Sequence, residues 1–190
     1  MHPNTTDRLD LGPLLLARAR QAIAHHLGAG PAPADDARLR ERGACFVTLH
    51  RHGELRGCIG SIRPQRPLGE DVVQNAVAAA TKDPRFPPLA WDELASTQIE
   101  VSVLSSPEFI DFDDESDLMR QIVPREHGLI LFAGCRSATF LPQVWDQLPE
   151  PEGFLAALKR KAGLPPDRPA GGLMAARFEV RSWQENPGGA

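Results

Sequence analysis

The sequence predicts an α+β fold in which helices pack on a mostly antiparallel sheet. Apolar and polar residues alternate along several short segments, two of them joined by a tight turn, as in antiparallel hairpins. Three longer segments repeat apolar residues every three or four positions, which is the pattern of amphipathic helices. No glycine-rich phosphate-binding loop follows a predicted strand, so a doubly wound nucleotide-binding fold is disfavoured.

Length and composition indicate one folded domain spanning 1–190. The chain has 190 residues, 42% of them hydrophobic, which is enough to bury a core. A net charge of −4 and a pI of about 5.9 provide no basic surface for nucleic acid. We find no apolar run long enough for a membrane span, and the first ten residues do not resemble a secretory signal. Three cysteines without a CxxC pair predict neither a disulfide framework nor a metal site, so we expect a cytoplasmic protein without a cofactor.

Residues 1–43 are predicted to form a helix followed by a surface loop. Asp10 is placed to cap the helix, and Gly28 ends it. The stretch 28–36, rich in glycine, alanine and proline, continues as a loop. The side chains expected on the buried stripe of the helix are Leu16, Ile23 and Leu27.

The rest of the chain follows from the same patterns. Alternation predicts a hairpin at 44–62 and strands at 97–104, 127–132, 138–140 and 175–183. Helical spacing predicts helices at 68–83 and 152–163. The prolines of 84–94 indicate a rigid loop, and the acidic stretch 108–117 a solvated loop with Asp114 or Ser116 capping a short helix. The tail 186–190 is expected to be disordered.

The hairpin register decides which side chains lie together. A two-residue turn at His52-Gly53 would place Arg56 on the apolar face, which is costly unless the guanidinium is paired. A three-residue turn at 51–53 pairs Thr48 with Arg56 and puts Gly53 at a left-handed position. We predict this second register. The polar face then carries Thr48, His50, Glu54, Arg56 and Cys58. The apolar face carries Val47, Leu49, Leu55 and Ile59.

Cys58 is the leading candidate for chemistry. A guanidinium two residues away on the same face favours the thiolate, which is the nucleophilic form of cysteine. Gly57 and Gly60 flank Cys58 and leave bare backbone that a ligand can approach closely. The alternative is a small buried hydrophobic side chain, the commonest role of a free cysteine. Cys45 and Cys135 have no comparable arrangement of charge and are weaker candidates.

The run VTLHRHGELRGCIGSI (47–62), with its hexapeptide LRGCIG at 55–60, resembles the signature of the AMMECR-type domain family. The similarity covers about 45–185 and continues in KDPRFPPL (82–89), IEVSVLSSPE (99–108), HGLIL (127–131), FLPQVW (140–145) and FLAALKRKAGL (154–164). The resemblance implies an α+β domain of two lobes, with the hexapeptide near a cleft between them. Because the family includes protein A of the AmmeMemoRadiSam three-gene system, it also implies Memo-like and radical SAM proteins as partners.

Two further segments supply candidate site residues. In KDPRF a proline-stiffened loop can present Arg85 for anion binding and Asp83 as a base. The alternative is a salt-bridged helix end with Phe86 and Trp91 in the core. His127 opens a strand, where it can act as an acid or base near neutral pH or simply bind a backbone carbonyl.

These residues support two main hypotheses. In the first, the protein is an enzyme that binds a small anionic or carbonyl-bearing substrate, with Cys58 as thiolate and His127 or Asp83 moving the proton. The substrate-binding residues would be Arg56, Gly57, Gly60, Arg85 and Thr48. In the second, the protein is a non-enzymatic module that holds a partner or a substrate for other enzymes. A nucleic-acid regulator is the third and least supported hypothesis.

Overall fold

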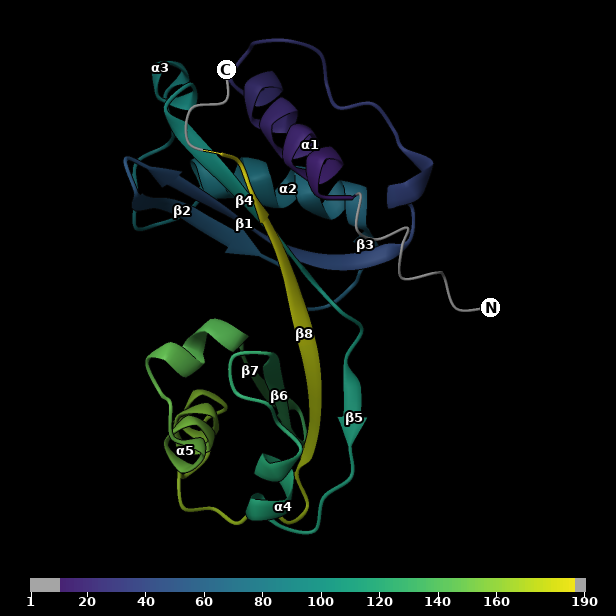
Figure 1. Cartoon of the computed structure of the whole chain (residues 1–190), viewed down its shortest axis with the longest axis vertical. Coiled ribbons are helices and arrows are strands. Elements are labelled where there is room, and N and C mark those ends of the chain that lie inside the picture. The colour runs from purple at the N-terminus through teal and green to yellow at the C-terminus, as the bar shows by residue number, and fades with distance from the viewer. Residues whose placement is uncertain (1–10, 187–190) are drawn as a thin grey trace. The chain divides into compact units, whose positions relative to one another are not determined.

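The computed structural model describes residues 11–186 and confirms the α+β class (Figure 1). The helices are α1 (Leu11–His26), α2 (Leu68–Thr81), α3 (Trp91–Leu94), α4 (Glu115–Arg120) and α5 (Pro151–Lys161), with short 3-10 turns at Ala37–Leu39 and Pro142–Asp146. The strands are β1 (Arg42–Arg51), β2 (Glu54–Gly60), β3 (Arg66–Pro67), β4 (Thr97–Leu104), β5 (Glu108–Ile110), β6 (His127–Ala133), β7 (Arg136–Phe140) and β8 (Met174–Gln184). The predicted cap at Asp10 and the last four residues of the predicted tail lie outside the described residues. No helix within 11–186 combines the length and apolar content that crossing a membrane requires.

The strands pair in the order β2-β1-β4-β8-β6-β7, with β3 added to β1 and β5 to β8. The ladders of β1 with β2, β3 and β4 are antiparallel, as are those of β8 with β5 and β6 and of β6 with β7. The predicted elements are present, and Asp114 caps α4 by accepting the Asp117 backbone N–H. The sequence patterns missed three short elements, β3, α3 and β5.

The described chain divides into two compact units. Unit 1 comprises residues 11–104 and 181–186, and unit 2 comprises residues 105–180. Strand β8 contributes to both units, because its last residues belong to unit 1.

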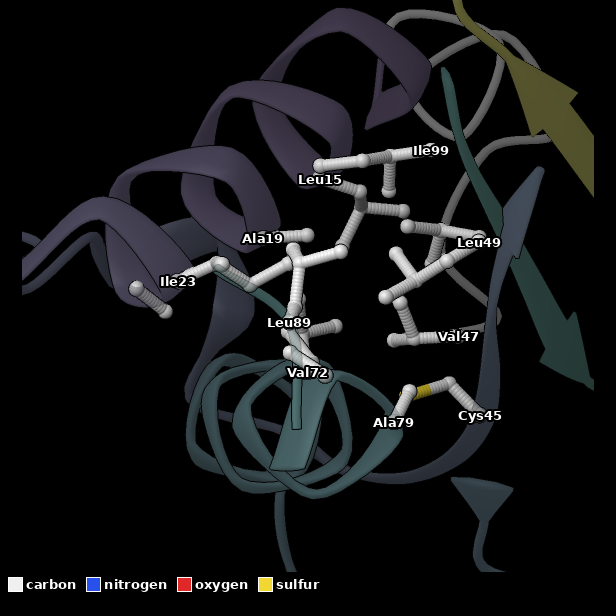
Figure 2. Close-up of a cluster of buried hydrophobic side chains, with 14 of the residues drawn as sticks. Leu15, Ala19, Ile23, Cys45, Val47, Leu49, Val72, Ala79, Leu89 and Ile99 are labelled. Carbon is white, nitrogen blue, oxygen red and sulfur yellow. The ribbon is translucent and has the colours of Figure 1, made fainter. Parts of the chain in front are cut away.

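In unit 1, α1 and α2 pack on one face of the strands (Figure 1). Their core is drawn in Figure 2 and includes side chains of α1, β1, α2 and β4. Of the predicted stripe of α1, Ile23 is fully buried, and Leu16 and Leu27 are half-buried and pack against the same core. The residues that α1 buries are Gly12, Leu15, Ala19, Ala22 and Ile23. Gly12 and the alanines carry no large apolar side chain, so the predicted stripe omitted them. A Cβ on Gly12 would lie 2.2 Å from the Trp183 ring.

In unit 2, α5 packs on β6 and β7. Trp145 and Phe154 stack at its centre, with ring centroids 3.9 Å apart and an interplanar angle of 4°. Both side chains are fully buried. As predicted, α5 is followed by Gly163, which has a positive φ of 73°.

The hairpin of β1 and β2 has a different turn from the predicted one. Arg51 pairs with Glu54, so the turn has two residues, His52 and Gly53, with φ of 55° and 82°. Two successive positive φ values are the requirement of a type I′ turn. The positive φ of Gly53 is therefore confirmed, whereas the three-residue turn is wrong.

A β-bulge then restores the alternation of side chains. Between Leu49 and His50 the partner on β2 changes from Gly57 to Leu55, so Arg56 is an extra residue without a partner on β1. Beyond the bulge Thr48 pairs with Cys58 and Val47 with Ile59. The predicted grouping of Val47, Leu49 and Ile59 on one face and of Thr48 and Cys58 on the other is thus confirmed. The predicted pair of Thr48 with Arg56 is wrong, and Leu55 is 39% exposed instead of buried.

Candidate functional site

Cys58 lies on β2, an edge strand, with its thiol on the polar face of the hairpin. The side chain is half-buried, and its Sγ accepts a hydrogen bond from the Thr48 hydroxyl over 3.4 Å. The backbone N–H of Cys58 donates to Asp83 Oδ2 over 2.9 Å. Both the strand pairing and the anchored backbone hold the thiol in a defined position.

Asp83 is the anchor of this segment. It follows α2 and is 4% exposed. Besides Cys58, it accepts the Arg85 backbone N–H at 3.1 Å and two guanidinium N–H groups of Arg85 at 3.0 and 2.7 Å. These bonds, chiefly those from the Arg85 side chain, hold the pKa of Asp83 well below its ordinary range. Because protonation would break several of them, the geometry favours a positioning role for Asp83 over the predicted role as a base.

Arg85 places a positive charge close enough to interact with the candidate thiol. Its guanidinium shares Asp83 Oδ2 with the Cys58 amide, and its side chain is still 54% exposed. The pKa of Arg85 is raised, first by its hydrogen bond to Asp83 and least by the charge of Cys58. It lies 5.5 Å from the centre of the Phe86 ring. An exposed guanidinium beside a thiol is able to bind an anionic group of a ligand.

Arg56, predicted to lie beside the thiol, is bound elsewhere. Its guanidinium donates to both carboxylate oxygens of Glu93, at 3.3 and 2.9 Å, and to the Pro87 carbonyl at 3.0 Å. Glu93 also binds Arg51 and the Ala90 backbone N–H. These bonds, the Arg56 side chain first, lower the pKa of Glu93 to about 2. The side chain of Arg56 is 11% exposed, so this ion pair ties the bulge to α3 and leaves little guanidinium surface for a ligand.

Gly57 and Gly60 have packing explanations. A Cβ on Gly57 would lie 2.2 Å from the Ala79 carbonyl oxygen of α2. A Cβ on Gly60 would lie 2.3 Å from the Phe46 ring. The space beside each glycine is filled by the protein itself, and the substrate contact suggested for them stays a prediction.

His127 belongs to unit 2, where it begins β6. Its Nδ1 accepts the Val123 backbone N–H at 3.0 Å, which leaves the proton of the neutral ring on Nε2. Its carbonyl accepts the Trp145 indole N–H at 3.1 Å. The catalytic role suggested for His127 stays a prediction. Of the predicted site residues, the structure brings together Cys58, Thr48, Asp83 and Arg85.

A row of polar side chains lies on the Cys58 face of unit 1. The hairpin pattern placed His50 on this face, but the pairing with β4 that adds Glu100 and Ser102 was not predicted. Thr48 lies opposite Cys58 on β2 and opposite Glu100 on β4. His50, two residues along β1 on the same face, places Nε2 3.4 Å from Glu100 Oε2. Ser102 donates to the other carboxylate oxygen of Glu100 at 3.3 Å. The row could be found only by knowing that β4 pairs with β1, which alternation alone does not reveal.

A second polar cluster was also missed, and it is buried. Asp71 on α2 accepts the Cys45 backbone N–H at 3.0 Å, the Ser61 hydroxyl at 2.8 Å and the Asn75 amide at 3.0 Å. Burial, then the charge of Asp71, raise the pKa of Cys45 far above its ordinary value. Arg66 lies 3.4 Å from Asp71. This cluster joins α2 to the strands, and its thiol is held protonated.

The described residues contain no group of three or more histidine, cysteine or acidic side chains placed to hold a metal ion. Among residues 11–186, every buried side-chain nitrogen or oxygen has a hydrogen-bond partner. The protein groups gathered at the candidate site are a thiol, a hydroxyl, a guanidinium and the polar row.

Comparison with known proteins identifies the class to which this fold and motif belong. The family model described as AMMECR1 matches residues 16–183. Protein MK0488 of Methanopyrus kandleri is 41% identical over 170 residues, covering 84% of this chain and 80% of that protein. Protein MJ0810 of Methanocaldococcus jannaschii is 42% identical over 155 residues, covering 77% and 75%.

A solved structure shares the fold. The crystal structure of uncharacterized protein PH0010 from Pyrococcus horikoshii matches with a TM-score of 0.80 and 35% identity, covering 95% of each chain. The chain belongs to the AMMECR1 family. The family resemblance expected from the hexapeptide and the KDPRFPPL segment is confirmed.

Proposed function

We propose that this AMMECR1-family protein is a thiol-dependent enzyme acting on a small substrate that carries a carbonyl group and an anionic group. The observation that carries the proposal is the setting of Cys58. Its thiol is half-buried, its backbone is anchored by Asp83, and the half-exposed guanidinium of Arg85 is bound to the same carboxylate oxygen. A fixed thiol beside an available cation has two of the properties that nucleophilic cysteines require.

In the proposed reaction, Arg85 binds the anionic group and Cys58 attacks the carbonyl. The electron pair of Sγ forms a bond to the carbonyl carbon, and the π pair moves to the oxygen. Collapse of this intermediate expels the leaving group, which takes up the proton released by the thiol. Water then hydrolyses the thioester and regenerates the thiol. The proposal places the enzyme in the cytoplasm beside the Memo-like and radical SAM proteins that the family resemblance implies.

The test compares an anionic with a neutral alkylating reagent. Iodoacetate and iodoacetamide modify the same thiols but differ in charge, and peptide mass spectrometry measures the rate at each cysteine. Cys135 is an exposed internal control with its own neighbouring arginine, and Cys45 is a buried one. We expect the ratio of iodoacetate rate to iodoacetamide rate to be higher at Cys58 than at Cys135. We expect Arg85→Met to lower this ratio at Cys58 at least threefold and to leave it unchanged at Cys135.

The same experiment can overturn the proposal. Equal ratios at Cys58 and Cys135 would exclude an anion site beside the thiol. Modification of Cys58 only after unfolding in urea would exclude a reactive thiol altogether.

The second candidate function is a non-enzymatic binding module. The observation that favours it is the use of the hexapeptide for packing: Arg56 binds Glu93, and both glycines contact neighbouring protein atoms. In that case Cys58 would serve only to pack the hairpin. An unreactive Cys58 in the folded protein is the result that selects this second function.

A further inference from the structure

We propose that His50, oriented by Glu100, takes up the Cys58 proton and returns it to the leaving group. This inference rests on the proposed function and adds its acid–base group. A nucleophile needs a base on the same face, and the base needs a partner that fixes its ring. In unit 1 the thiol, the imidazole and the carboxylate lie on one face of three adjacent strands.

The positions of His50, Glu100 and Ser102 indicate the role of each in the proton transfer. Glu100 lies 3.4 Å from His50 Nε2, so Nδ1 is left for the transferred proton. The side chains of His50 and Glu100 are 25% and 23% exposed, which restricts their motion and keeps some water out. Ser102, which is 4% exposed, donates a hydrogen bond to the second carboxylate oxygen of Glu100, so both oxygens of this carboxylate have partners. Glu100 is therefore a positioning residue, and His50 is the base.

The Thr48 hydroxyl lies on the path between the thiol and the imidazole. It donates to Cys58 Sγ at 3.4 Å, and His50 follows it by two residues on the same face of β1. Cys58 and His50 are diagonal neighbours across the hairpin, a separation within reach of long side chains in antiparallel sheets. The proposed transfer runs past the Thr48 hydroxyl, and a bridging water molecule is a common element of such proton paths.

The residues paired with His50 in the two ladders carry no charge that competes for the proton. Leu55 lies opposite it on β2 and Gln98 opposite it on β4. Strand β8 contributes the Ser182 hydroxyl, which lies 2.7 Å from that of Ser102. The titratable or charged groups that face the path are Glu100, Cys58 and, beyond the edge of β2, Arg85. Asp83 is less suited to accept the proton because its oxygens already accept four N–H groups.

The test is the pH dependence of Cys58 alkylation by iodoacetamide between pH 5 and 9.5. In the wild-type protein we expect a step in the rate below the main rise of the profile, because a base coupled to the thiol assists its deprotonation. His50→Gln should remove this step and lower the rate at pH 7 at least fivefold. At pH 9.5, where hydroxide can remove the thiol proton without His50, the two proteins should react alike. His52→Asn is the matched control, because His52 lies in the turn of the same hairpin and asparagine tolerates its positive φ.

The outcomes separate this inference from the proposed function. Coincident profiles of wild type and His50→Gln would overturn the role of His50, while the iodoacetate ratio at Cys58 would still support the enzyme. A rate reduced equally at pH 7 and at pH 9.5 would show a structural effect and would also overturn it. If circular dichroism shows that His50→Gln does not fold, Glu100→Gln is measured instead. It should lower the rate at pH 7 at least twofold and leave the rate at pH 9.5 unchanged, and an unchanged rate at pH 7 would refute the inference.

Discussion

Each position of the hexapeptide 55–60 meets a different neighbour, and these neighbours explain the residue types. Arg56 has a carboxylate and a carbonyl within reach, and Gly57 lies against the backbone of α2. Cys58 is the exception. Packing alone explains neither its hydrogen bond with the Thr48 hydroxyl nor the Arg85 guanidinium that binds Asp83, the residue that anchors the Cys58 backbone. The motif thus combines several structural residues with one residue suited to chemistry.

The contact at Gly57 gives a prediction about stability. Gly57→Ala should lower the free energy of unfolding by about 1–3 kcal/mol, because the new Cβ would lie 2.2 Å from a carbonyl oxygen of the helix backbone. Urea unfolding followed by circular dichroism measures the change. Gly153→Ala is the control: nothing lies within 4 Å of that Cβ, and alanine is favoured over glycine inside a helix. A Gly57→Ala protein as stable as wild type would mean that α2 moves away from β2 at little cost.

At the scale of elements, the hairpin shows what alternation can and cannot predict. Alternation correctly assigned Val47 and Leu49 to the core face and Thr48 to the other face. The reverse assignment would expose apolar side chains and bury polar ones, which is costly. Alternation failed at the bulge, which inserts Arg56 and resets the pairing. The partner that makes this arrangement favourable, Glu93, is 37 residues further along the chain and is brought there by a short helix without strong periodicity.

In the candidate site, too, the sequence pattern predicted the contacts within the hairpin but not those between distant segments. Cys58 and Thr48 lie on one two-stranded element, so local patterning placed them on the same face. The pairing of β1 with β4 joins segments that are about fifty residues apart, and it alone brings Glu100 beside Thr48 and His50. Such non-local pairing is decided by packing of the whole unit, which the local pattern does not contain.

The ion pair between Arg56 and Glu93 gives a pH-dependent prediction. The pKa of Glu93 is lowered to about 2, so its ion pairs stabilise the fold above its unfolded pKa, near 4.3. This stabilisation is lost as the pH falls from about 4.3 towards 2. At pH 7, Glu93→Gln should therefore lower the free energy of unfolding by about 1–3 kcal/mol. The difference from wild type should shrink steadily between pH 5 and pH 3.

Urea unfolding at pH 7, 5, 4 and 3 measures this difference. Asp92→Asn is the matched control, since Asp92 is an exposed carboxylate at the adjacent position of α3. Asp83 also has a lowered pKa and titrates in the wild type and in both variants, so it cancels from the difference. A difference that is as large at pH 3 as at pH 7 would contradict the assignment of the stabilisation to Glu93.

At the scale of the whole molecule, the described chain contains two hydrophobic clusters with no residue in common. The cluster of unit 1 contains Leu49, and that of unit 2 contains Leu131; both leucines are 0% exposed. Each cluster is built from helices and strands of its own unit, with β8 as the strand that contributes to both units. Two separate cores can unfold one at a time when their free energies of unfolding differ.

This division predicts how core substitutions act. Leu49→Ala and Leu131→Ala remove the same side chain from a fully buried strand position in each unit, and each should cost about 2–5 kcal/mol. Because the two sites share no neighbours in these clusters, the costs should add to within about 0.5 kcal/mol in the double variant. Hydrogen exchange measured by mass spectrometry should show faster exchange for Leu49→Ala mainly in β1, α2 and β4, and for Leu131→Ala mainly in β6, β7 and α5. If either substitution accelerates exchange equally in both sets of peptides, the two units open as one, and the strand that they share couples them completely.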